Sequence, residues 1–200
     1  MRILRASALV LSLFAPMAQA QMSNGNGGAS FNSLDRANDP TKEMMARFID
    51  ASRMTLTGNQ QLLAALGQSQ EAAAMGEQAG QLSESMTRLA VEKNLEAQLR
   101  GVTASTKALA AGGQVPVAQL EQGLASLAQA VAQYDQLMKD LPEAKAAMNT
   151  MRQVTKVDTP TFFMLRSLSS STASLKKEIH AVAQAAQQAG AKVPEALLAI

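Results

Sequence analysis

The chain has 200 residues, a single His, no Cys and nearly balanced charges of 18 Lys and Arg against 16 Asp and Glu. The absence of Cys excludes disulfides, thiolate metal sites and thiol nucleophiles, and one His excludes a metal site built from several histidines. Aromatic residues make up 3% of the chain, whereas Ala, Gln, Leu and Met, which favour helices, are abundant. Because almost no segment alternates apolar and polar residues with a period of two, the sequence predicts an all-α fold without a sheet.

Residues 1–20 have the layout of a secretory signal peptide. Arg2 and Arg5 precede an apolar run from Ala6 to Met17, and Ala18-Gln19-Ala20 gives the small-x-small pattern of a cleavage site. The apolar run is too short for a transmembrane helix, which needs about 20 residues. We therefore expect cleavage, a periplasmic or secreted product and no transmembrane segment after cleavage. Loss of Arg2 and Arg5 removes the formal net charge of +2, and with it any electrostatic reason to bind nucleic acid.

Residues 21–38 are rich in Gly, Asn and Ser, which predicts a flexible leader, and residues 39–200 then form a single helical-bundle domain. Asp39-Pro40 opens the first helix as N-cap and first helical residue. This helix carries a row of residues spaced alternately four and three positions apart along one face, which we call a seam. The row is Met45, Ile49, Ser52, Leu56, Asn59, Leu63 and Leu66. We expect the helix to end among Gly76 and Gly80.

The second predicted helix covers residues 81–111. Leu82, Met86 and Leu89 lie on one of its faces, while Val91 and later apolar residues lie on nearly the opposite face. We therefore expect a bend near residue 90 or packing on two different neighbours.

The third predicted helix starts at Val115-Pro116 and has the most regular seam. Its members are Val117, Leu120, Leu124, Leu127, Val131, Tyr134, Met138 and Leu141. Asp140 and Glu143 have capping-box spacing around Pro142, so the sequence predicts a kink or a fresh helix start there, with continuation to about residue 154.

The fourth predicted helix starts at Thr159-Pro160 and ends at Gly190. Its seam is Leu165, Leu168, Thr172, Leu175, Ile179, Val182, Ala186 and Ala189. A short apolar tail, 195–200, follows, and we expect it either to fold back over the bundle end or to dock on a partner. Four amphipathic helices of this kind predict an elongated antiparallel four-helix bundle with coiled-coil-like packing.

His180 is one candidate for chemistry, because one His and one Met on facing helices can hold haem in a bundle. Met44, Met45 or Met54 would be the partner. His180 lies one residue off the seam, however, beside Lys177. We therefore interpret it as a solvated histidine and predict no cofactor.

Met148 and Met151 are the candidate metal ligands. Their spacing of three places both thioethers on one helix face, and thioethers suit Cu(I). The alternative is that they fill the core, as Met does in many helical proteins.

No set of residues in the sequence predicts catalysis. Acidic residues are scattered and mostly adjacent to a base, as in Glu92-Lys93, whereas catalytic carboxylates converge on a pocket. We expect a non-enzymatic, exported protein that acts in the bacterial envelope by protein–protein interaction, scaffolding or self-association. The alternatives are a periplasmic carrier of a metal or small ligand that uses the Met-rich bundle core, and a subunit of an envelope secretion or conjugation apparatus.

Overall fold

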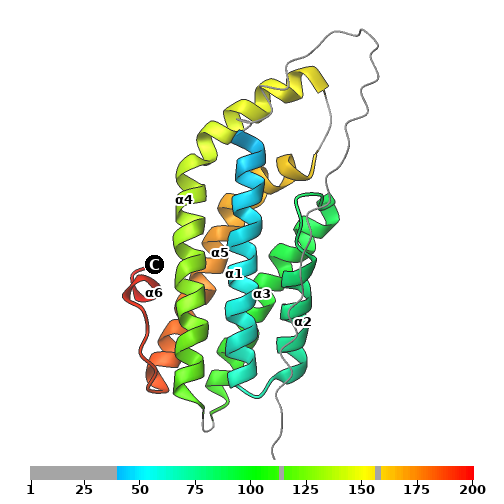
Figure 1. The fold of residues 1–200 in the computed structure, drawn as a ribbon. Helices are drawn as coiled ribbons and strands as arrows, with labels where there is room; N and C mark the ends of the chain where they lie inside the picture. The colour runs from blue at the N-terminus through cyan, green and yellow to red at the C-terminus, as the bar shows by residue number, and fades with distance from the viewer. Residues whose placement is uncertain (1–39, 113–114, 156–158) are drawn as a thin grey trace, which may run out of the picture.

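The computed structural model describes residues 40–112, 115–155 and 159–200, and for Pro40 and residues 151–155 it describes the backbone alone. The predicted signal peptide and leader lie outside these residues. The described residues contain helices and no strand, which confirms the all-α bundle (Figure 1). The helices are α1 (Pro40–Ala65), α2 (Ser69–Gln81), α3 (Arg88–Ala110), α4 (Val117–Thr155), α5 (Pro160–Gln188) and α6 (Glu195–Leu198).

Helix α1 is the centre of the bundle. It contacts α2, α3, α4 and α5, while α3 packs along α5 and α4 also packs on α5. Consecutive long helices run in opposite directions, so that α2 and α4 are antiparallel to α1, α3 and α5 (Figure 1). The apolar seams predicted for α1, α4 and α5 are buried along most of their lengths.

The first predicted helix is in fact two helices. It ends at Ala65, and α2 begins at Ser69. Between them Gly67 has a φ of +74°, a left-handed conformation that glycine adopts readily and that commonly ends a helix. The prediction that this helix runs on to Gly76 and Gly80 was therefore wrong, since the chain reverses at Gly67 and Ser69–Gln81 form the separate helix α2.

The second predicted helix starts later than expected. Thr87 is the N-cap of α3, and its side chain accepts a hydrogen bond from the Ala90 amide at 3.2 Å. Leu82 and Met86 are buried but precede this helix, and Leu89 is 57% exposed. The predicted common face of these three residues does not exist, because two of them belong to the connection between α2 and α3.

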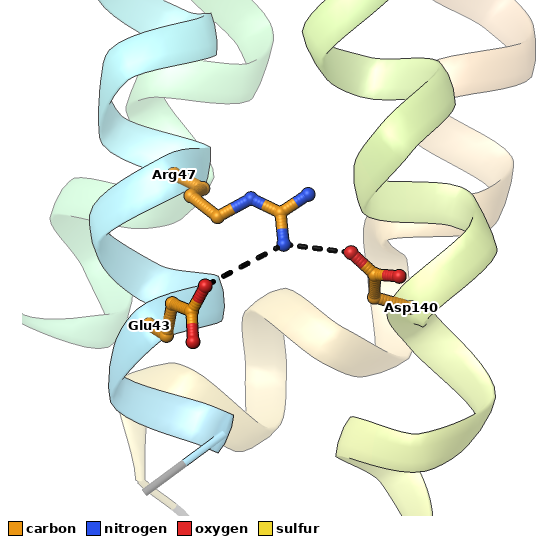
Figure 2. Close-up of polar contacts among 3 residues, drawn as sticks. All are labelled: Glu43, Arg47 and Asp140. Carbon is orange, nitrogen blue, oxygen red and sulfur yellow. Dashed lines mark hydrogen bonds and ion pairs between the residues drawn. The ribbon is translucent and has the colours of Figure 1, made fainter. Parts of the chain in front are cut away.

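Helix α4 continues without a break through Pro142 to Thr155. Its axis bends in the last part, beyond the green-to-yellow change in Figure 1, consistent with the hydrogen bond that Pro cannot donate. Asp140 does not cap a new helix, and instead its Oδ2 accepts a bond from Arg47 Nη1 of α1 at 2.6 Å (Figure 2). With 39 residues against 26 in α1, α4 is about 20 Å longer at 1.5 Å per residue.

The tail folds back on the bundle. Helix α6 contacts α5 and α4, and Leu197 is fully buried. His180 Nδ1 lies 3.1 Å from the Leu197 carbonyl oxygen, so this histidine holds α6 against α5.

Candidate functional site

A cluster of uncharged polar side chains is buried where α1, α3 and α4 meet. Asn94 Nδ2 and Gln98 Nε2 each donate to Ser52 Oγ, at 2.9 and 3.0 Å. Tyr134 donates its hydroxyl proton to Gln98 Oε1 at 2.7 Å. Each of these side chains is at most 3% exposed, so the cluster is a closed network inside the core.

Burial of Tyr134 raises the pKa of its hydroxyl to about 12, although hydrogen bonds with Ser52, Gln98 and Thr55 oppose the shift. Loss of solvation disfavours the charged phenolate. Tyr134 is therefore protonated throughout the neutral range and acts there as a hydrogen-bond donor, with no capacity to serve as a base.

The network explains the two polar members of the α1 seam. Ser52 bonds to Asn94 and Gln98, and Asn59 donates to the Gln98 carbonyl oxygen at 3.0 Å. On α3 the matching row is Asn94, Gln98, Gly101 and Ser105, all buried. The apolar pattern of this segment does not reveal the row; the signal was the same 4-3-4 spacing, carried here by three polar residues and Gly101.

A cavity of about 230 Å³ adjoins the network between α3 and α5. Leu95 and Leu99 of α3, Tyr134 of α4 and Ser171, Thr172 and Leu175 of α5 contribute to its wall. The cavity thus has an apolar wall on α3 and a row of hydroxyl groups on α5.

A second hollow, of about 180 Å³, lies between the distal part of α4 and the start of α5. Met148, Phe162 and Leu165 give it an apolar lining, and Lys145 and Arg166 add two positive charges. Asn149 completes the wall. We call this feature the α4–α5 hollow.

The predicted metal ligands are only partly described. Met148 is 8% exposed and lies in the α4–α5 hollow, whereas the side chain of Met151 falls outside the described residues. No group of three or more His, Cys, Asp or Glu side chains in the described part of the chain could hold a metal ion. The structure thus associates Met148 with an apolar hollow, and the metal hypothesis stays a prediction.

His180, interpreted from the sequence as a solvated histidine, is instead half-buried. Gln184 Nε2 lies 2.8 Å from its Nε2, and its Nδ1 faces the Leu197 carbonyl. These two contacts fit the tautomer with the proton on Nδ1, since Gln184 donates to Nε2. Both ring nitrogens are therefore engaged in fixing the tail.

The charged cluster drawn in Figure 2 fastens α1 to α4 near Pro142. Arg47 Nη1 lies 2.6 Å from Asp140 Oδ2 and 4.0 Å from Glu43 Oε1. The Arg47 Nη2 atom is buried and has no hydrogen-bond partner among the described residues. We interpret the cluster as a structural clamp at the base of the extended part of α4.

Comparison with known proteins gives no match: no protein-family model, curated protein or solved structure is significantly similar to this chain. Among the described helices, none combines the length and apolar character required to cross a membrane.

Proposed function

We propose that this chain is an exported, non-catalytic helical-bundle protein that acts by binding another protein of the bacterial envelope through the α4–α5 hollow. The observation that carries the proposal is the pairing of an apolar hollow with a positively charged rim. Met148, Phe162 and Leu165 supply the apolar surface, while Lys145 and Arg166 supply the charges. Buried apolar pockets flanked by Arg are typical of the energetically dominant parts of protein interfaces.

The size and charge of the hollow support an inference about the chemistry of the partner. Its volume of about 180 Å³ suits one large apolar side chain as an anchor. Lys145 is half-buried and Arg166 is exposed, so carboxylates beside that anchor would pair with them and favour a correct orientation. We therefore infer an apolar residue flanked by Asp or Glu as the partner segment.

The absence of a catalytic role is part of the same proposal. The buried polar network of α1, α3 and α4 consists of Ser, Asn, Gln and Tyr side chains bonded to one another. Nucleophilic or acid–base catalysis needs a titratable group poised near the working pH, and the Tyr134 pKa of about 12 is far above that range. Such a network specifies how the helices pack.

A photo-crosslinking amino acid at position 149 tests the proposed interface in living cells. Asn149 is exposed and lines the hollow. We expect a discrete adduct whose partner, identified by mass spectrometry, contributes an apolar residue with acidic neighbours. An adduct between two copies of this chain would instead assign the hollow to self-association.

The matched control carries the same crosslinker at Ala74, which is exposed on α2. We expect no such adduct from position 74. The same set of adducts from both positions, or none from position 149, would contradict the proposed interface.

Export has its own test, which is independent of the partner. The full-length chain, produced in a Gram-negative host, is expected in the periplasmic fraction with Gln21 at its N-terminus. Retention of Met1 in a cytoplasmic product would contradict the predicted signal peptide.

A further inference from the structure

Helix α5 carries five hydroxyl residues within the six positions from Ser169 to Ser174, in the middle of a 29-residue helix. Ser and Thr are weaker helix formers than the Leu, Ala and Gln used elsewhere, because their hydroxyls compete for backbone hydrogen bonds. Local sequence that opposes the structure it adopts is a common mark of a functional position.

These residues also line a pocket that is partly open to solvent, with Glu96, Ser170 and Ser174 exposed in its wall. Ser171 and Thr172 stand in the wall of the 230 Å³ cavity opposite Leu95 and Leu99, where larger side chains would close the space. The Thr172 side chain is buried, and its hydroxyl has no hydrogen-bond partner among the described residues. A buried unpaired hydroxyl lowers the stability of the fold.

We propose that the α3–α5 cavity is a binding site for a small, uncharged, mostly apolar molecule that carries one hydroxyl or carbonyl group. Leu95, Leu99 and Leu175 contact its apolar body. The Thr172 hydroxyl bonds to its polar group after rotation about the Cα–Cβ bond, since Thr in helices occupies two such rotamers. This site is separate from the α4–α5 hollow.

The volume of the cavity and the charge in its wall limit the class of ligand that it can bind. Cavities of about 150 Å³ hold a benzene-sized molecule, so 230 Å³ suits a substituted single ring. Glu96 is the one charged residue in the cavity wall, which disfavours a carboxylate ligand. The ligand class is therefore a neutral phenol, alcohol or ketone of about eight to ten heavy atoms.

Titration of the purified protein with p-cresol, toluene and p-toluate, followed by NMR, tests the site. We expect saturable binding of p-cresol, about fivefold weaker binding of toluene because one hydrogen bond is lost, and no binding of p-toluate. In Thr172→Val the affinity for p-cresol is expected to fall to that for toluene, with the toluene affinity unchanged.

Ser171→Leu should fill the cavity and abolish binding of both neutral probes. Ser169→Leu is the matched control, because Ser169 is exposed in the same run and outside the cavity wall; it should bind as the wild type does. Absence of saturable p-cresol binding, equal affinities for p-cresol and toluene, or retained binding in Ser171→Leu would overturn the assignment.

Discussion

The contact between α1 and α4 is densely packed, whereas the contacts made by α5 leave space between the helices. Around Gly58 and Gly123 the backbones of α1 and α4 approach so closely that a Cβ on either glycine would meet a neighbouring leucine at 3.0 Å or less. Helix α5, by contrast, contributes one wall to the α3–α5 cavity and one to the α4–α5 hollow.

The difference suggests that one region of the bundle provides stability and another provides binding surfaces. Dense packing, as at Gly58 and Gly123, stabilises a fold because every atom has close neighbours. Incomplete packing weakens a fold and offers room for another molecule. We infer that the contact between α1 and α4 holds the structure together, while α5 forms binding surfaces with α3 on one side and with the distal part of α4 on the other.

The largest loss of stability is expected at the close contact between α1 and α4. A Cβ on Gly123 would lie 2.7 Å from Leu62 Cγ and 3.1 Å from the Gly58 carbonyl oxygen, so Gly123→Val should lower the free energy of unfolding by about 3 kcal/mol through overpacking. Urea denaturation measures this. The control is Gly80→Ala in α2, where the added Cβ meets nothing within 4 Å, and a gain of about 0.5–1 kcal/mol is expected from helix propensity.

Alkaline pH should weaken the fold through Tyr134. Because burial raises its pKa to about 12 from 10.0, the unfolded chain loses this proton at a lower pH than the folded chain does. The contribution of Tyr134 to the free energy of unfolding is therefore fully present below pH 10 and falls by about 2 kcal/mol as the pH rises to 12. The chain has one Tyr, so near-ultraviolet absorbance of tyrosinate reports it directly.

Tyr134→Phe should remove this part of the pH dependence and, by leaving Gln98 Oε1 without its donor, lower stability at neutral pH. A tyrosinate midpoint near 10 in the folded protein would show that Tyr134 is not buried in the network.

The contrast between the two regions also explains what could be predicted from sequence. The seams of α1, α4 and α5 were recognised because apolar spacing reports a face that packs on other helices, and Leu56, Leu127 and Ile179 are indeed fully buried. The break at Gly67 was missed because Gly76 and Gly80 carry the same sequence signal, and only the backbone conformation distinguishes them.

The polar core could not be found by the same method. Asn94 and Gln98 occupy the buried face of α3 because they satisfy Ser52 on α1, and a pattern of apolar residues has no means of pairing hydrogen-bond groups on separate helices. The cavity at Thr172 was likewise hidden, since a seam position does not reveal whether the facing side chains fill the space. Met148, predicted as a metal ligand, lines the α4–α5 hollow with Phe162 and Leu165, and its role as a ligand stays a prediction.

A smaller loss of stability is expected when the ion pair between Arg47 and Asp140 is weakened. Asp140→Asn weakens the bond to Arg47, whose second terminal nitrogen already has no partner among the described residues. With side chains 25% and 38% exposed, solvent screens the pair, so the loss should be about 1 kcal/mol. Denaturation in high salt checks the cause: the difference between variant and wild type should shrink as ionic strength rises.

A gain in stability is expected from a substitution at Thr172, in the wall of the α3–α5 cavity. Thr172→Val removes a buried hydroxyl that lacks a partner and keeps the shape of the side chain, so stability should rise by about 0.5–1 kcal/mol. Thr106→Val is the control, because that hydroxyl donates to the Val102 carbonyl at 3.2 Å, and it should give no gain. A loss of stability in Thr172→Val would mean that the hydroxyl is satisfied in the native protein.

The claim that α5 presents the binding surface is tested most directly by a charge-reversal variant, in which the adduct formed from position 149 is measured. Arg166→Glu lies on the rim of the α4–α5 hollow and is exposed, so the unfolding free energy should change by less than about 0.5 kcal/mol while the yield of the adduct falls at least tenfold. Arg100→Glu, equally exposed on α3, should change neither quantity. An adduct that persists in Arg166→Glu, or that disappears equally in Arg100→Glu, would contradict the claim that α5 presents the binding surface.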